Sequence, residues 1–426
     1  MDSFIYYYWA FAINFIYFVW LIIQRKYRFF LPSTISSFIW TITTLLVILH
    51  LNGFLGKDSL SPNAMNHVSR FTCYLSIASV IGFSLSHLFT DKYESFVRLR
   101  PINIVDIEQL LQYFKWIPYL CGIVGLTLVV FLITSIGDIS SFSDYRVLAI
   151  QTERVGYAAL AQRISGHINI LGGFYLMLLG YKSGKSGIHV KEFLLYSLLC
   201  SAINMSIGGR VWILTSLLPF FTTYILSRKS SQRNKRQNAQ DLKKLISILS
   251  IFIFFFAIIG TLRDDTNSGG LFDKFLYLTD GSRMTNMVLD QYPETMYSYE
   301  LGKSTLLGGF IKSPMVARFA NSIADDIGLS VTVKSIMPNL YYDFGLIGGA
   351  IFWGIICFFC EIFCIRLKYS LHIIGLFLYG TLSTMFFQAP VGNIFTLYTP
   401  TFEWIFLLYI FRKQIFPHRI GVQCRF

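Results

Sequence analysis

Charged residues are scarce in this chain, and their scarcity excludes an ordinary soluble domain. Only 14% of the 426 residues are Asp, Glu, Lys or Arg, whereas 54% are hydrophobic and the mean hydropathy is +0.55. A soluble globular protein carries about 25% charged residues. The hydrophobic residues form blocks of roughly 17–23, each long enough to cross about 30 Å of hydrocarbon as a helix. The composition therefore predicts an all-α polytopic membrane protein.

Signatures of soluble catalysis are also missing. The sequence has no Walker loop, no His-Glu-x-x-His, no Gly-x-Ser-x-Gly and no nucleotide domain of the transporter kind. Cys357, Cys360 and Cys364 have a spacing that resembles a metal site, but they lie in an apolar block where small apolar side chains suit a packed helix. We therefore expect no metal, no other cofactor, no use of ATP and no disulfide framework.

Eleven apolar blocks predict eleven transmembrane helices. The loops at one end of these helices hold 23 of the 36 Lys and Arg residues, which places that end in the cytoplasm. The N-terminus is then outside and the C-terminus inside. The same distribution explains the net charge of +13 without nucleic-acid binding, which we do not expect. The predicted spans are residues 4–23, 29–51, 71–89, 116–136, 167–181, 192–208, 211–227, 245–262, 340–365, 371–388 and 395–411.

One long interval without a membrane-spanning run divides the chain. Residues 1–262 are predicted to form an N-terminal membrane bundle of about eight helices, and residues 338–426 about three more helices and a basic tail. Residues 263–337 contain many Gly and Pro breaks but also apolar side chains to bury, so we expect a partly helical cap on the outer side. Another outer connection has an acceptable helix start at Ser143 and predicts an interfacial helix to about Ala161.

Arginines on the outer connections are the main candidates for chemistry. A planar guanidinium binds phosphate through two parallel hydrogen bonds, and a partly dry site strengthens that contact. Arg210 is the clearest case, because it follows Gly208 and Gly209 in a tight turn between two apolar helices, where charge is costly. A snorkelling or surface side chain is the alternative for each. The other candidate phosphate ligands are Arg146, Arg154, Arg163, Arg263, Arg283 and Arg318.

The pattern leaves the general base open among four residues. The seven histidines form no cluster, and only His167 stands at the outer end of a predicted helix. Asp264, Asp265 and Asp280 lie in the long outer interval, where a carboxylate could accept a proton. A structural histidine and solvated or helix-capping aspartates are the alternative interpretations.

Three stretches and the overall topology carry a family resemblance. Residues 207–210, Ile-Gly-Gly-Arg, precede an apolar helix and a basic inner loop. Residues 299–304 lead through Pro314 towards Arg318, and residues 338–349 re-enter the membrane after the long outer interval. In this order they resemble the Wzy-type O-antigen polymerases, also called oligosaccharide repeat unit polymerases. The paired Arg and Gly loop motifs of some members do not occur at their spacing here.

The resemblance implies a glycosyltransferase with a GT-C-like fold on the periplasmic face of the bacterial inner membrane. It implies that undecaprenyl-diphosphate-linked repeat units serve as donor and acceptor in the biosynthesis of lipopolysaccharide O-antigen or a similar polysaccharide. Outer arginines would hold the donor diphosphate and stabilise its developing charge, with Arg210 first and Arg154 and Arg263 next. Membrane lipid is an implied partner, and a chain-length regulator is a candidate one, although no motif marks its binding surface.

Three other interpretations compete with this one. An O-antigen ligase uses the same donor, but the ligases carry a histidine in the large outer loop, and residues 263–337 contain none. A polysaccharide flippase or transporter would have charged residues and broken helices near the middle of the membrane. A purely structural membrane protein leaves the outer arginines unexplained.

Overall fold

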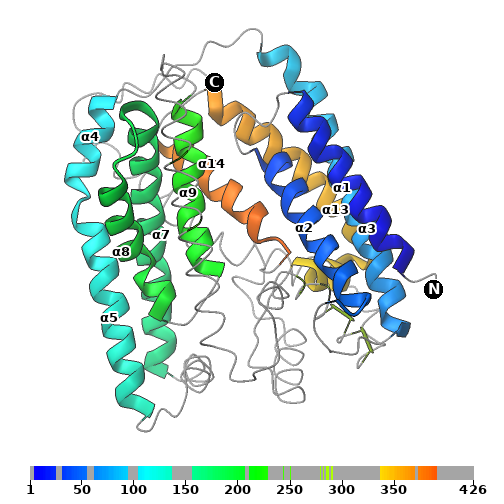
Figure 1. Cartoon of the computed structure of the whole chain (residues 1–426), viewed down its shortest axis with the longest axis horizontal. Helices are drawn as coiled ribbons and strands as arrows, with labels where there is room; N and C mark the ends of the chain where they lie inside the picture. The colour runs from blue at the N-terminus through cyan, green and yellow to red at the C-terminus, as the bar shows by residue number, and fades with distance from the viewer. Residues whose placement is uncertain are drawn as a thin grey trace.

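The computed structural model describes about half of the chain in detail, and this part is helical (Figure 1). Within the described residues the backbone forms helices and turns and contains no strand, which confirms the all-α prediction for that part. The described residues are 4–24, 31–54, 62–94, 104–136, 156–206, 211–228, 336–369 and 373–390, with the single residues Lys243, Ser250, Thr279, Ser282, Thr285, Asn286, Leu289 and Asp290.

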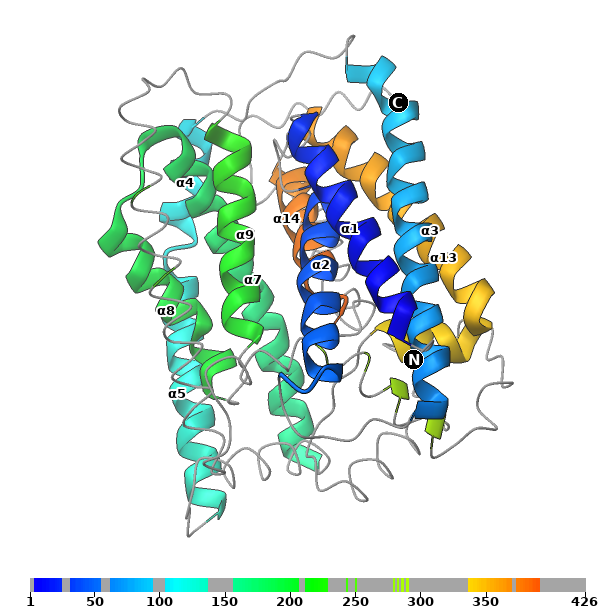
Figure 2. The same ribbon diagram turned by 45° about the vertical axis from the view of Figure 1, so that its right-hand side comes forward.

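The described helices pack as two bundles joined by one helix (Figures 1 and 2). The first bundle consists of α1 (Ile5–Ile23), α2 (Pro32–Leu51), α3 (Pro62–Glu94) and α13 (Ile336–Tyr369). The second consists of α4 (Ile104–Tyr113), α5 (Trp116–Ile136), α7 (Gly156–Ser186), α8 (Val190–Ser206) and α9 (Val211–Arg228). Helix α14 (Ile373–Gln388) contacts α9 of the second bundle and both α2 and α13 of the first.

Aromatic side chains fix α14 between the bundles. Phe386 packs against Phe83 of α3 with ring centroids 5.8 Å apart and against Trp353 of α13 at 5.5 Å. Nearer the start of α14, Phe377 meets Phe174 of α7 edge to face at 5.4 Å. All five of these rings are almost fully buried, and aromatic pairs at such distances stabilise a contact beyond the area that they bury.

Several described helices have the length and hydropathy of a membrane span. Five segments within the described residues meet both requirements: Ile5–Ile23, Pro32–Leu51, Ala64–Thr90, Ile107–Val130 and Asp343–Arg366. This is the character of a multi-pass membrane protein. The predicted spans 245–262, apart from Ser250, and 395–411 lie outside the described residues, so the total of eleven stays a prediction.

Helix boundaries agree with the prediction where apolar residues fill the helix and differ where polar residues extend it. Helix α5 has the predicted bounds, and α1 begins one residue later than predicted. Helix α3 begins at Pro62, nine residues before the predicted span, because its first turns are polar. Helix α7 begins at Gly156, so the last residues of the predicted interfacial helix, 156–161, belong to α7. Hydropathy marks only the apolar part of a helix.

Glycine and alanine allow close contact within each bundle. In the first, Ala78 and Gly82 of α3 face Gly354 of α13: a Cβ on Gly82 would overlap the carbonyl oxygen of Gly354. In the second, Gly180 and Gly184 of α7 lie against α9 in the same way. Small residues four apart let helix backbones approach closely in membranes, where packing rather than hydrophobicity drives helix association.

Helix α13 is interrupted near its beginning. Gly345 has φ 69° and ψ −172°, which is not helical, and glycine adopts this conformation without the steric cost that a Cβ brings. The break lies in residues 338–349, the stretch that carries the third part of the family resemblance. Asp343, two residues earlier, is fully buried.

Candidate functional site

Most of the predicted site residues lie outside the part of the chain that the structure describes. His167 is the one predicted site residue described with its side chain, and Arg163 is described as part of helix α7 only. The remaining predicted residues, which lie outside the described residues, are Arg146, Arg154, Arg210, Arg263, Arg283, Arg318, Asp264, Asp265 and Asp280.

The described helices nevertheless establish where two arginine-bearing connections begin and end. Helices α5 and α8 run in the same direction, because Gly122 approaches Leu199 and Gly125 approaches Ala202. Helices α7 and α9 are likewise parallel, because Gly180 lies against Phe220 and Gly184 against Ser227.

Only three residues separate α7 from α8, so α8 turns back along α7. The last residues of α5 and α8 therefore lie at the same end of the second bundle as the first residues of α7 and α9. Residues 137–155, which contain Arg146 and Arg154, and residues 207–210, which contain Arg210, are both anchored at that end.

The turn at the opposite end of α7 and α8 shows why the two helices reverse. Gly187 has φ 108°, a conformation that side chains rarely permit, and its N–H donates to the carbonyl oxygen of Ser183. Lys182 and Glu192 form an ion pair across the turn, with Nζ and Oε1 3.7 Å apart. Burial lowers the pKa of the nearby Lys185. This end carries one of the basic loops that predict the cytoplasmic side.

His167 lies farther from the start of its helix than the sequence predicted. We expected it at the outer end of a helix, but α7 begins at Gly156, so His167 is eleven residues, or about 16 Å, along the helix. Its side chain is partly buried and has a partner. Arg163, expected in the outer connection, is also part of α7, one turn before His167. Gln162 and Arg163 interrupt the apolar sequence of α7, which concealed the helix's true length.

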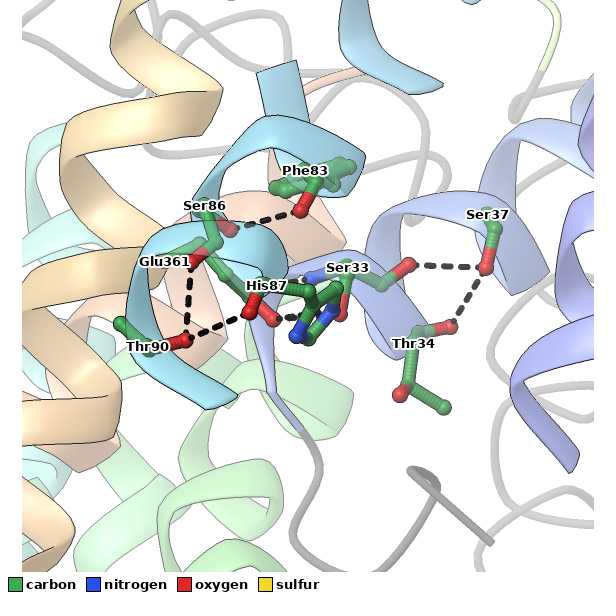
Figure 3. A network of polar contacts seen from close by, with 8 residues as sticks. All are labelled: Ser33, Thr34, Ser37, Phe83, Ser86, His87, Thr90 and Glu361. Carbon is green, nitrogen blue, oxygen red and sulfur yellow. Dashed lines mark hydrogen bonds and ion pairs between the residues drawn. The ribbon is translucent and has the colours of Figure 1, made fainter. Parts of the chain in front are cut away.

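The clearest polar cluster in the described residues was not predicted. Glu361 of α13 is fully buried and meets both α2 and α3 (Figure 3). Its Oε2 accepts a hydrogen bond from the backbone N–H of Ser33 at 3.0 Å, and its Oε1 accepts one from the Ser33 hydroxyl at 2.6 Å. The same Oε1 lies 3.3 Å from Nε2 of His87, which is also buried. We call Ser33, His87 and Glu361 the carboxylate cluster.

Local structure explains each member of the carboxylate cluster. Ser33 is in the first turn of α2, where Pro32 takes the first helical position and the free N–H groups and the helix dipole favour a negative charge. His87 is on α3. Beside it, the hydroxyl of Thr90 donates a hydrogen bond to the carbonyl oxygen of Ser86 at 2.8 Å. On α2, the hydroxyl of Ser37 donates a hydrogen bond to the carbonyl oxygen of Ser33 at 2.8 Å.

The charged residues inside a predicted membrane span could have identified one member of this cluster from the sequence. Asp343 and Glu361 are the charged residues of the predicted span 340–365. An ionisable residue inside a membrane span is by default a functional candidate. They are eighteen residues apart, five helical turns, although the break at Gly345 lies between them. The partners on α2 and α3 could not be inferred, because they are more than 270 residues away in the chain.

The surroundings of the cluster are polar, and many of the hydroxyls there form hydrogen bonds within their own helix, although the buried hydroxyls of Thr34 and Ser36 form none among the described residues. Helix α3 buries a stripe of hydroxyls, and several donate to carbonyl oxygens of their own helix, as Ser76 does to Thr72 and Ser86 to Phe83. Asn14 of α1 donates to the Ser76 hydroxyl at 2.8 Å. Such bonds let Ser and Thr lie at helix interfaces at little cost. Among the described residues, no group of three or more His, Cys, Asp and Glu could hold a metal ion.

Comparisons with known proteins give no family for this chain. No protein-family model, no curated protein and no solved structure matches it. The resemblance to the O-antigen polymerases therefore rests on the three stretches of sequence described above, and the function must be argued from the chain's own residues and helices.

Proposed function

We propose that this protein polymerises lipid-diphosphate-linked oligosaccharide repeat units into a surface polysaccharide. The donor is a glycan on undecaprenyl diphosphate, and the acceptor is the non-reducing end of an incoming unit. The reaction takes place on the periplasmic face of the bacterial inner membrane, with the N-terminus outside and the C-terminus inside. In this proposal the chain has eleven spans, and residues 263–337 cap the site.

The main support for the proposal is that two connections containing arginines leave the same side of the second bundle. The last residues of α5 and α8 and the first residues of α7 and α9 point to the same side of one bundle, although α7 extends further than α9 on that side, so Arg146, Arg154 and Arg210 belong to connections that leave the bundle in the same direction. By the distribution of Lys and Arg, this is the outer side. A lipid-linked diphosphate presents its charge at that membrane surface.

Arginine at this position can supply catalysis without a metal or ATP. When the bond between the sugar and the phosphate breaks, negative charge grows on the leaving diphosphate. Guanidinium groups that already point at that position stabilise the charge more in the transition state than in the ground state. The acceptor hydroxyl needs a base, for which His167, Asp264, Asp265 and Asp280 remain the candidates.

A transporter or flippase is the second candidate, and one described feature favours it. The carboxylate cluster and the break at Gly345 place ionisable groups and a broken helix inside the bundle, as transporters do. Glu361, however, is five residues from the end of the span Asp343–Arg366, far from the middle of the membrane. The polymerase is therefore the better supported of the two.

Deleting the gene in its host and resolving the surface glycan by size tests the proposal. A polymerase deletion should leave a single repeat unit attached to the core and remove the ladder of longer chains. Expression of the wild-type protein from a plasmid should restore the ladder. Loss of all attached glycan, including the single unit, would instead indicate a ligase or a transporter and would overturn the proposal.

A further inference from the structure

Helix α3 exposes a stripe of large apolar side chains along one face. Its members recur at intervals of three and four residues, which is the spacing of a single helix face. They are Tyr74, Ile77, Ile81, Leu85 and Leu88. Helix α3 packs against α1 and α13 and lies between them in Figure 2. Because α3 has the length and hydropathy of a membrane span, lipid chains are expected to cover this stripe.

Arg70 stands at the start of the stripe, one turn before Tyr74. Its side chain is exposed, and it directly precedes the predicted span 71–89. From Arg70 to Leu88 are eighteen residues, or about 27 Å of helix, which is close to the roughly 30 Å of hydrocarbon in a bilayer. When the stripe faces hydrocarbon, the guanidinium is therefore at the level of the lipid headgroups.

The contacts of α1 show on which side of the membrane this level lies. Helices α1 and α3 run in the same direction, because Tyr6 contacts Arg70 and Asn14 contacts Ser76. The start of α1 is predicted to be outside, so Arg70 is on the outer side as well. The preference of Lys and Arg for the cytoplasmic side does not account for an arginine there.

Aromatic side chains near the start of α1 mark the same boundary. Tyr8 and Trp9 are exposed, and Tyr6, which contacts Arg70, is partly buried. Tyrosine and tryptophan gather where hydrocarbon meets headgroups, because their rings are apolar and their polar groups reach water. Two neighbouring helices thus indicate one membrane surface at the level of Arg70.

The contact between Arg70 and Tyr6 holds the guanidinium without supplying an oxygen acceptor. Cζ of Arg70 lies 5.4 Å from the centre of the Tyr6 ring, within the range of a cation–π contact. The ring face attracts the charge, and the N–H groups can still donate to a phosphate, which arginine binds through two parallel hydrogen bonds. His67, one turn before Arg70 and partly buried, has a ring N–H that can add a further donor.

We propose that Arg70, supported by Tyr6, binds the phosphodiester of an anionic glycerophospholipid in the outer leaflet, and that an acyl chain of this lipid lies along the outer half of the stripe. Ile81 is eleven residues, or about 16 Å, beyond Arg70, which is close to half of the hydrocarbon thickness. The lipid places a negative charge at the guanidinium and an apolar chain on the exposed face. This site belongs to the first bundle and does not depend on the proposed polymerisation.

The test is lipid binding to purified full-length protein in detergent, measured by native mass spectrometry with phosphatidylglycerol as the added lipid. The quantity to compare is the apparent Kd of the first bound lipid for wild type and for Arg70→Gln. We expect roughly tenfold or more weaker binding by the variant, because hydrogen bonds to charged groups are lost. Lys191→Gln is the matched control: it removes one exposed positive charge from α8 and should leave this Kd unchanged.

Further comparisons separate the geometry of the site from its charge. Arg70→Lys keeps the charge but loses the planar fork, so its Kd should lie between those of wild type and Arg70→Gln. This variant carries the test if Arg70→Gln lowers the yield of folded protein. Phosphatidylethanolamine has a phosphodiester but no net charge, so wild type should bind it more weakly than phosphatidylglycerol. That preference should disappear in Arg70→Gln.

Equal Kd values of wild type and both Arg70 variants for phosphatidylglycerol would overturn the proposal. An equal loss in Lys191→Gln would overturn it too, because it would indicate unspecific attraction of charge. Displacement of phosphatidylglycerol from wild type by the same concentration of undecaprenyl diphosphate would assign the site to a different lipid and contradict the choice of a phospholipid. Because the readout is lipid binding and not glycan synthesis, failure of the proposed function would leave this result unaffected.

Discussion

At the scale of single residues, the proposed chemistry depends on arginine rather than on positive charge alone. Arg210 follows two glycines between α8 and α9, and the bounds of these helices leave only residues 207–210 for the connection. A guanidinium offers a rigid fork of donors that matches two oxygens of a phosphate. A lysine ammonium is a point charge on a flexible stem and cannot reproduce that geometry.

Both Arg210→Ala and Arg210→Lys should therefore abolish long glycan chains while protein levels stay normal. Loss of one preorganised donor to a developing negative charge reduces turnover roughly 100-fold or more. The measurement is the size distribution of surface glycan in a deletion host that expresses each variant, with membrane protein levels measured in parallel. Arg228→Lys, at the other end of α9, is the matched control and should give normal chains. Normal chain lengths in both Arg210 variants would refute the role assigned to this residue.

At this scale the sequence identified which residues are unusual, but it did not show which side chains surround them. The turn at Arg210 stands out because charge and glycine interrupt apolar sequence. Glu361 interrupts its predicted span in the same way, and its significance becomes clear only when Ser33 and His87 are seen beside it. His167 was misplaced along its helix because Gln162 and Arg163 interrupt the apolar sequence of α7 after its first turns.

At the scale of helices, close backbone contact through glycine holds each bundle together. Gly180 of α7 is at such a contact: a Cβ there would overlap the carbonyl oxygen of Phe220 and lie 2.5 Å from the hydroxyl of Thr223. The Thr223 hydroxyl in turn donates to the carbonyl oxygen of Met177 at 2.8 Å, a hydrogen bond between α9 and α7. This interface also fixes the relative position of the helix ends that anchor the arginine connections.

Gly180→Leu should separate α7 from α9 and lower the Tm of the purified protein by roughly 5 °C or more, because the clash involves backbone atoms that cannot move aside. Gly173→Leu is the matched control on the same helix, since a Cβ at Gly173 has nothing within 4 Å. Its Tm should stay close to that of wild type. Equal effects of the two substitutions would show that the α7–α9 contact is not as close as described.

Sequence pattern predicted individual helices better than their packing. The bounds of α5 follow directly from its uninterrupted apolar run, whereas α3 extends beyond its apolar part. Small residues such as Gly82 and Gly354 mark a packing face, but the sequence does not say which helix receives it. The pairing of α3 with α13 joins segments more than 200 residues apart, and only the three-dimensional structure reveals it.

At the scale of the whole molecule, the described helices form two bundles with α14 between them (Figures 1 and 2). The second bundle anchors connections with Arg146, Arg154 and Arg210, and the first contains the carboxylate cluster and Arg70. Helix α13, which follows the predicted cap, packs with α2, α3 and α14. The two proposals therefore concern different bundles and, by the charge distribution, the same side of the membrane.

The central claim is that this protein alone joins lipid-linked repeat units, and reconstitution measures it most directly. Purified protein in liposomes would be given repeat units on undecaprenyl diphosphate, without ATP, and the glycan products would be separated by size. We predict a ladder of two or more repeat units with wild type and none with Arg210→Ala. Products no longer than one repeat unit with folded wild-type protein, or an undiminished ladder with Arg210→Ala, would contradict the account.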